Sequence, residues 1–206
     1  MSYEISNEVE LRRHLGEPIH ELVVAKSTDS LNGAMRRFIA LSPFAVLATH
    51  DTDGASDVSP RGDAPGWVHM RDNKTLILPE RPGNKRLDSV LNIISQPKLS
   101  LLFMIPGVLE TVRINGTGSV SMDPNLLAHF RVNGKLPELC IVVTITEALG
   151  HCSKAYRRSK LWEDVYRPTS PVPSLAQLMS DHLDLNATLA KELDEGIEAD
   201  VAERMY

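Results

Sequence analysis

Cysteine, basic charge and long apolar runs are all scarce in this sequence. Two cysteines occur among its 206 residues. Cys140 and Cys152 provide neither a disulfide framework nor paired metal-ligand spacing, so a reduced, cytoplasmic setting is expected. No apolar run approaches the ~18 residues that span a bilayer, and Met1-Ser2-Tyr3-Glu4 is not the basic-then-apolar start of a signal peptide. We therefore expect no membrane association.

The motifs of several enzyme classes are missing as well. The sequence has no H-E-x-x-H or C-x-x-C motif and its seven histidines are scattered, so no metal site is expected. It has no G-x-S-x-G elbow and no P-loop. The 22 lysines and arginines are outnumbered by 27 aspartates and glutamates, for a net charge of −5. That balance argues against nucleic-acid binding, which needs a basic surface, but it is compatible with a local phosphate site.

What is present is an ordinary globular composition, with 42% hydrophobic and 24% charged residues. Apolar runs and alternating patterns predict strands at 44–49, 55–60, 67–70, 75–78, 98–105, 110–122 and 139–146. Apolar residues at helical spacing predict helices at 5–16, 30–41, about 87–94, after 123, at 152–162 and within 175–206. This pattern predicts a mainly β fold of the α+β class, an antiparallel barrel with flanking helices.

Breaks in the pattern divide the chain into three parts. Residues 1–42 are expected to form a helical segment that packs on the barrel, and residues 43–166 the barrel itself. Pro168, Pro171 and Pro173 indicate a linker at the start of 167–206, and acidic helices are expected to follow it.

A basic turn lies between the strand at 75–78 and the helix after it. It reads Arg81-Pro82-Gly83-Asn84-Lys85-Arg86-Leu87-Asp88. The unpaired N–H groups of a helix N-terminus suit a phosphate. Cations at that end oppose the helix dipole unless an anion binds between them. The alternative is a solvated basic turn that Glu80 and Asp88 balance.

A second motif, Asp57-Val58-Ser59-Pro60-Arg61-Gly62-Asp63, ends a predicted strand in Pro, Arg and Gly. Ser59 and Arg61 can hydrogen-bond a flat polar edge, such as the carbonyl and N–H edge of a flavin. The alternative is a β-turn with a surface Arg61–Asp63 pair, which contributes little to stability.

Two further stretches carry polar residues in a pattern. Thr111, Arg113 and Asn115 alternate and therefore share one strand face, which is either a binding groove or a solvent face. The predicted helix 152–162 contains Lys154, Arg157, Arg158 and Lys160, mostly on one face. That face closes over a ligand phosphate, meets a partner subunit, or is simply solvated.

Together these motifs resemble the FMN-binding split-barrel family related to pyridoxamine 5'-phosphate oxidase, over roughly residues 30–165. The strongest likeness is Gly83-Asn84-Lys85-Arg86, followed by Asn92 and Gln96-Pro97. The corresponding loop of the oxidases reads Gly-Ser-Arg-Lys-Ala, and its cations hold the FMN phosphate. Ser59 to Gly62 and Glu110 to Gly116 look most like a branch of that family labelled as flavin-dependent enzymes.

The resemblance implies FMN as cofactor and a homodimer with the flavin in a groove between subunits. Asn84, Lys85 and Arg86 would hold the phosphate. The residues expected along the ring are Val58, Ser59, Pro60, Arg61, Thr111 and Arg113. The partner subunit would contribute Ser153, Lys154 and Arg158.

The implied function is that of an FMN-dependent oxidoreductase with a small-molecule substrate, and no catalytic residue is assigned. The Arg-x-His segment with which the oxidases recognise pyridoxal phosphate has no counterpart here, which argues against vitamin B6 oxidase activity. The alternative is a flavin- or haem-binding module without turnover, because split barrels host both. A haem would need an axial ligand such as His69 or His151. Whether a deazaflavin replaces FMN stays open.

Overall fold

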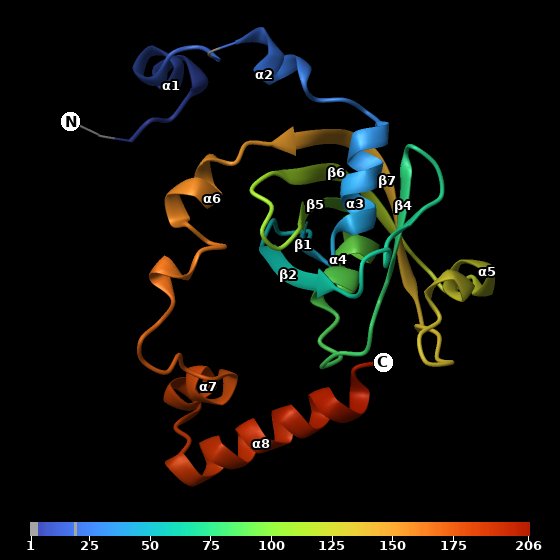
Figure 1. Ribbon diagram of the computed structural model, residues 1–206, viewed down its shortest axis with the longest axis vertical. Coiled ribbons are helices and arrows are strands. Elements are labelled where there is room, and N and C mark those ends of the chain that lie inside the picture. Colours follow the sequence, from blue (N-terminus) through green and yellow to red (C-terminus); the bar gives the residue numbers. More distant parts are fainter. Residues whose placement is uncertain (1–3, 19) are drawn as a thin grey trace.

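The computed structural model describes residues 4–18 and 20–206, in which seven antiparallel strands form one sheet (Figure 1). The strands are β1 (Phe44–His50), β2 (Ser56–Gly62), β3 (His69–Met70), β4 (Thr75–Pro79), β5 (Lys98–Met104), β6 (Thr111–Ser121) and β7 (Cys140–His151). Their order across the sheet is β2-β1-β5-β6-β7-β4-β3. The predicted α+β fold, an antiparallel split barrel with flanking helices, is confirmed.

β2 extends past its predicted end and runs through Pro60. Proline cannot donate a ladder hydrogen bond, and it is tolerated here because β2 lies at the edge of the sheet. Alternation along the strand leaves Asp57, Ser59 and Arg61 half-buried on one face. Val58 and Pro60 are exposed on the other face. The strand therefore presents only every second predicted ligand residue to the same side.

The β6–β7 ladder is long and contains a bulge. Its register shifts between Asn115 and Gly116. A Cβ at Gly116 would lie 2.3 Å from the backbone oxygen of Thr144, so only glycine fits at this close approach. Because β6 offers partners along its whole length, β7 runs past its predicted end at residue 146 to His151.

Helices stand before, between and after the strands. Their bounds are α1 (Glu8–Leu15), α2 (Glu21–Ala25), α3 (Gly33–Leu41), α4 (Asp88–Ser95), α5 (Pro124–Leu127), α6 (Lys154–Ser159), α7 (Leu175–Leu183) and α8 (Ala187–Arg204), with 3₁₀ turns at Ala128–Phe130 and Asp164–Tyr166. α2 was not predicted. α6 is shorter at both ends than the predicted helix 152–162. It stops at Ser159 because Lys160 takes a left-handed conformation (φ 48°).

The hydrophobic core lies between the curved sheet and helices α3 and α4. α3 contributes Met35 and Ile39, and α4 contributes Val90 and Ile93. Met35, Ile39 and Ile93 pack in one cluster with sheet residues such as Phe103, which is fully buried. Packing of α4 against β1, β2 and β6 fixes the position of the helix start and of the basic turn that precedes it.

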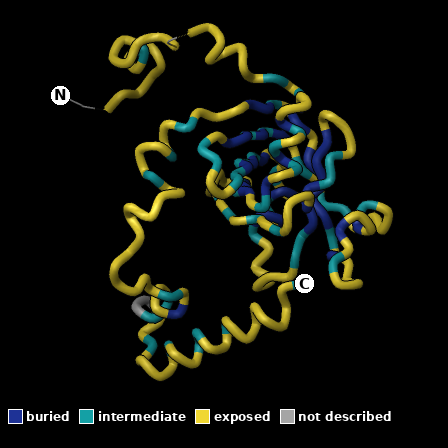
Figure 2. Tube along the Cα trace, in the orientation of Figure 1, coloured by how far each residue is buried: buried dark blue, intermediate teal, exposed yellow. Residues whose placement is uncertain are grey.

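The two ends of the chain are far less buried than the barrel (Figure 2). α1, α2 and α8 contain no buried residue. Of the predicted linker 167–174, residues 167–173 are exposed and Ser174 is the N-cap of α7. The division of the chain at residues 42 and 166 stays a prediction. Among the described residues, no helix is both long enough and apolar enough to span a membrane.

Candidate functional site

The basic loop turns sharply just before α4. Lys85 and Leu87 both adopt the left-handed conformation, each with φ of 61°, which non-glycine residues rarely do. The side-chain oxygen of Asn84 accepts a hydrogen bond from the backbone N–H of Arg86 at 3.0 Å. Within the described chain the NH₂ group of Asn84 has no partner, so it is free to donate to a ligand.

The N-terminus of α4 has no side-chain cap, because the capping position is occupied by Leu87. The first N–H groups of the helix are therefore open at the positive end of its dipole. Arg86 donates to Asp88 at 2.6 Å in an exposed pair. Lys85 has no ion pair among the described residues. Asp88 thus balances Arg86, as the solvated-turn alternative predicts. Glu80 pairs with Arg61 instead. Lys85 therefore remains available to bind an anion.

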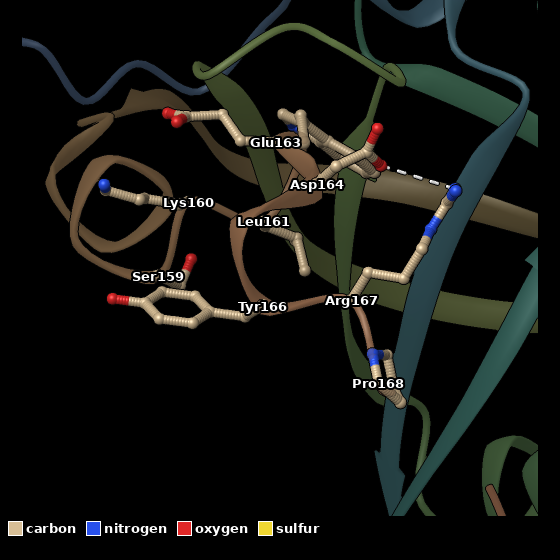
Figure 3. A pocket seen from close by; sticks show the side chains of 9 residues that line it. Ser159, Lys160, Leu161, Glu163, Asp164, Tyr166, Arg167 and Pro168 are labelled. Carbon is tan, nitrogen blue, oxygen red and sulfur yellow. Dashed lines mark ion pairs between the residues drawn. The ribbon is translucent and has the colours of Figure 1, made fainter. Parts of the chain in front are cut away.

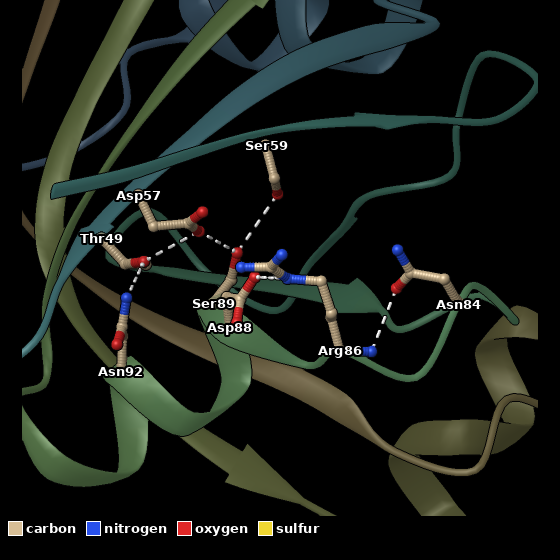
Figure 4. A network of polar contacts seen from close by, with 8 residues as sticks. All are labelled: Thr49, Asp57, Ser59, Asn84, Arg86, Asp88, Ser89 and Asn92. Carbon is tan, nitrogen blue, oxygen red and sulfur yellow. Dashed lines mark hydrogen bonds and ion pairs between the residues drawn. The ribbon is translucent and has the colours of Figure 1, made fainter. Parts of the chain in front are cut away.

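A hydrogen-bonded network joins β1, β2 and α4 beneath this loop (Figure 4). Ser89 donates to Asp57 at 2.8 Å, and the hydroxyls of Ser59 and Ser89 lie 3.2 Å apart. Asn92 donates to Thr49 at 3.1 Å, and Thr49 donates to Asp57. Ser89 has one hydroxyl proton, which goes to Asp57, so Ser59 is the donor to Ser89. The oxygen of Ser59 remains able to accept a hydrogen bond from a ligand.

Arg61 does not form the pair with Asp63 that the turn alternative predicts. Its Nη1 donates to both carboxylate oxygens of Glu80, at 2.7 and 2.8 Å, because the inward face of β2 meets the end of β4. Asp63 lies beyond the strand end and binds Arg81 at 2.8 Å. The Arg61–Glu80 side chains are 18% and 15% exposed. Nε of Arg61 is buried and lacks a partner in the described structure.

A cavity of about 1280 Å³ lies between β2, the loop before α4, the segment 135–139 and the end of α8. Half of the predicted cofactor residues line it: Ser59, Pro60, Arg61, Asn84, Lys85 and Arg86. Val58, which is 64% exposed, does not line it.

Thr111 and Arg113 belong to a second cluster, on β6 and β7. β6 is separated from β2 by β1 and β5. Arg113 and Asn115 donate to Glu147 at 3.4 and 2.5 Å, and Ser27 donates to it at 2.6 Å. The hydrogen bond from Ser27, together with the Arg113 charge, lowers the pKa of Glu147. Nε of Arg113 is buried and, within the described chain, has no partner.

The predicted α6 residues lie on the same side as this second cluster, since His151 at the end of β7 pairs with Thr111. Lys154 and Arg158 are exposed, and Ser153 accepts a hydrogen bond from Arg157. A hollow of about 400 Å³ follows α6 (Figure 3). Among the described residues its lining comes from the short segment between Ser159 and Pro168, so it brings no distant groups together.

A family model for pyridoxamine 5'-phosphate oxidase matches residues 31–152, which is more than half of the chain. The chain belongs to this family. The resemblance carried by its motifs is thereby confirmed, and the match contains β1 to β7, the loop before α4 and nine of the twelve predicted cofactor residues. Ser153, Lys154 and Arg158 lie just beyond its end. A search of curated proteins returned no match.

Several solved structures are similar to the chain. HupZ of Group A Streptococcus is 18% identical, with 57% of this chain and 91% of that chain covered and a TM-score of 0.48. An FMN-binding protein of Syntrophomonas wolfei is 12% identical, with 70% and 96% covered and a TM-score of 0.43. The FAD-binding protein of Mycobacterium smegmatis is 16% identical, with 60% and 97% covered and a TM-score of 0.41.

The histidines that a haem site would use lie outside the cavity. His69 stacks on His129 with ring centroids 3.9 Å apart, and burial, with the charges of His129 and Arg71, lowers the pKa of His69. His151 is exposed on β7. No histidine or cysteine occurs among the described residues that line the cavity. The described part of the chain also has no metal-binding group of three or more His, Cys, Asp or Glu residues.

Sequence reasoning missed several residues that shape these clusters. Ser89 had no signal, and Glu80 was expected to balance the basic loop, but nothing in the sequence pattern pairs either residue with β2. Glu147 was not noted because β7 was predicted to end at residue 146. Tyr206 lines the cavity together with the end of α8, and no sequence signal places it there. Each depends on contacts between residues far apart in the chain.

Proposed function

We propose that this member of the pyridoxamine 5'-phosphate oxidase family is an FMN-dependent oxidoreductase. The observation that supports it best is the cavity in which the uncapped start of α4, the unpaired Lys85 and the inward face of β2 meet. An uncapped helix start with adjacent cations suits a phosphate. Ser59 and Arg61, on the same cavity, offer an acceptor and donors to a polar ring edge.

Lys85, Arg86 and Asn84 would hold the FMN phosphate in this proposal. Lys85 has no counter-ion to give up among the described residues, whereas Arg86 would exchange or share its contact with Asp88. Asn84 would donate through the NH₂ group that its turn leaves free. Charge-assisted hydrogen bonds of this kind contribute about 1.5–3 kcal/mol each.

Ser59 and Arg61 would hold the ring, in line with the unfilled hydrogen-bonding capacity of both side chains. FMN, when bound, supplies reversible two-electron redox chemistry. Arg61 stays charged at any relevant pH, so its role would be to stabilise negative charge near the ring rather than to move a proton. The cavity exceeds the ~300–1,000 Å³ of a typical small-molecule site, which supports room for a small substrate beside FMN.

Thr111, Arg113, Ser153, Lys154 and Arg158 would complete the site from a second subunit. They lie apart from the cavity within one chain, and Arg113 carries an unsatisfied buried Nε. The proposal therefore includes a two-fold homodimer with two shared sites. A flavin-loaded monomer at micromolar concentration in sedimentation would contradict it. A cytoplasmic setting, suggested by the two unpaired cysteines, belongs to the same proposal.

The decisive experiment is the absorption spectrum of the purified protein, followed by FMN titration. We expect a flavin spectrum that dithionite or a nicotinamide donor bleaches and air restores. A Soret band instead of a flavin spectrum would favour a haem module, although the cavity's described lining offers no histidine or cysteine ligand. A bound flavin that no donor reduces would identify a passive binding module.

A further inference from the structure

The end of α8 forms part of the wall of the proposed flavin cavity. Asp200, Val201 and Arg204 line it, together with Met205 and Tyr206 directly after the helix. Among the described residues, the remainder of α8, all of α7 and the linker before it contribute nothing to this lining. Figure 1 shows α8 approaching the barrel only with its C-terminal end. A region outside the family match thus reaches the predicted cofactor residues.

Tyr206 makes three contacts that hold this end in place. Its hydroxyl donates to Asp63 at 2.8 Å, and its ring lies 5.3 Å from the guanidinium carbon of Arg81. Lys135 donates to its backbone oxygen at 2.7 Å. The hydrogen bond to Asp63 raises the pKa of Tyr206, so the phenol stays protonated and able to donate at neutral pH. The contacts come from three separate segments around the cavity.

Elsewhere the α7–α8 hairpin is loosely attached to the barrel. Its two helices hold each other, since Ser174 and the backbone N–H of Ala176 both donate to Asp194. In the described structure no barrel element packs on either helix as extensively as they pack on each other. α8 buries no residue, and the linker 167–173 is exposed. The hairpin can therefore swing away by breaking polar contacts, without uncovering the core.

We propose that the α7–α8 hairpin is a lid on the cavity and that Tyr206 is the latch that keeps it closed. The proposal rests on the proposed function, because the ligand that the lid would retain is FMN. Asp63 and Arg81 bind each other as well as Tyr206, and neither is assigned to the cofactor. Removal of the latch therefore leaves the proposed phosphate and ring contacts in place.

The test compares FMN binding kinetics of the 206-residue wild type and Tyr206→Ala by stopped-flow flavin fluorescence. A latch slows both the entry and the exit of FMN, so its removal should make association and dissociation each about five-fold faster. A five-fold change is what the loss of one or two polar surface contacts produces. Tyr206→Phe keeps the ring on Arg81 and should be intermediate. Glu198→Ala, on an exposed part of the same helix, should match wild type. An increase in dissociation alone would make Tyr206 a ligand contact, and unchanged rates would also overturn the latch.

A second readout works without any cofactor. Trp67 lines the cavity, and Trp162→Phe leaves it as the sole tryptophan. In that background, Tyr206→Ala should raise the acrylamide quenching constant of Trp67 about two-fold, because the lid no longer shields the cavity. If the wild type binds no FMN, the proposed function fails while this measurement still tests the lid. Equal quenching with and without Tyr206 would overturn it.

Discussion

The two clusters of predicted cofactor residues satisfy their charges in different ways. Around the cavity, Arg61, Arg81 and Arg86 each have a carboxylate partner, while Lys85 has none in the described chain. On β6 and β7, by contrast, one carboxylate, Glu147, collects all the donors around it. Lys85 therefore has no carboxylate to release when an anion binds, whereas Arg113 shares Glu147 with Asn115 and Ser27. In our proposal this difference favours the loop before α4 as the phosphate site.

Removal of the two loop cations, Lys85 and Arg86, should have the largest effect of the changes that separate the two clusters. In Lys85→Ala/Arg86→Ala, two charge-assisted bonds of at least about 1.5 kcal/mol each are lost, so the FMN dissociation constant should rise about 150-fold. The fold should survive, because Arg86 is exposed and α4 is held by its buried face. Arg167→Ala removes a similarly exposed cation away from the cavity and should leave affinity unchanged. Stoichiometric flavin in the purified double variant would refute the phosphate assignment.

Gly116→Ala should distort the β6–β7 bulge next to the second cluster. A Cβ 2.3 Å from the Thr144 oxygen forces the bulge apart, which should lower the free energy of unfolding by about 2–3 kcal/mol in urea denaturation. Gly196→Ala is the matched control, since nothing lies within 4 Å of a Cβ there and the site is helical. That control should be neutral or slightly stabilising. Equal stability of the two variants would mean that the close approach at Gly116 does not exist.

Arg61→Ala should make a bound flavin harder to reduce, because it removes a positive charge and leaves Glu80 unpaired beside the ring. We expect the midpoint potential to fall by about 30 mV, a tenfold effect for a two-electron couple. Arg61→Ala/Glu80→Gln removes the stranded charge as well and should recover most of the loss. Potentials are measured by dye equilibration. The same value in wild type and Arg61→Ala would remove Arg61 from the ring site.

Mixed dimers test whether the two clusters serve one site from different subunits. Lys85→Ala/Arg86→Ala mixed with Lys154→Ala/Arg158→Ala should restore about a quarter of the FMN sites, since half the dimers are mixed and each has one intact site. Each variant alone should bind weakly. FMN stoichiometry is read from absorbance after refolding the mixture together. If no FMN binding is recovered although the subunits have exchanged, the two clusters do not form one site across the dimer.

The smallest expected effect concerns pH and Glu147. The folded state lowers its pKa below the ordinary 4.5, so its contribution to stability is complete above that value and is lost as the pH falls through the lowered pKa. The side chain is 34% exposed, so the effect should be below about 1 kcal/mol. Glu147→Gln should therefore lose less stability than wild type between pH 5 and pH 3 in thermal melts. If the melting temperatures of wild type and Glu147→Gln fall equally between pH 5 and pH 3, Glu147 does not act as an ionised acceptor.

Most of the strands could be predicted from the sequence, because their signals are local. The apolar run Phe44 to Thr49 and the alternating residues 110–122 each encode their structure within a few residues. Boundaries were wrong where a partner strand decides the length. β2 passes through Pro60 only because its outer edge is free, and β7 continues to His151 only because β6 lies beside it.

The candidate site divides in the same way. Asn84, Lys85 and Arg86 could be chosen from the sequence because a turn, two cations and a helix start are consecutive. The ion-pair partner of Arg61 could not be predicted, because Asp63 is nearer in the sequence while Glu80 is nearer in space. Glu147 and Tyr206 had no local signal at all, and both act through residues more than 30 positions away.

The sequence by itself determined the antiparallel α+β fold, the family and the position of the basic loop at a helix start, because hydrophobic periodicity and turn chemistry are properties of neighbouring residues. The tertiary structure alone decided which charges are paired, that the predicted residues form two clusters rather than one, and that the end of α8 reaches the cavity. Ion pairs and cavity walls depend on distances across the sheet. Those distances arise only when β2, β4 and α8 are brought together by the packed core and the contacts of Tyr206.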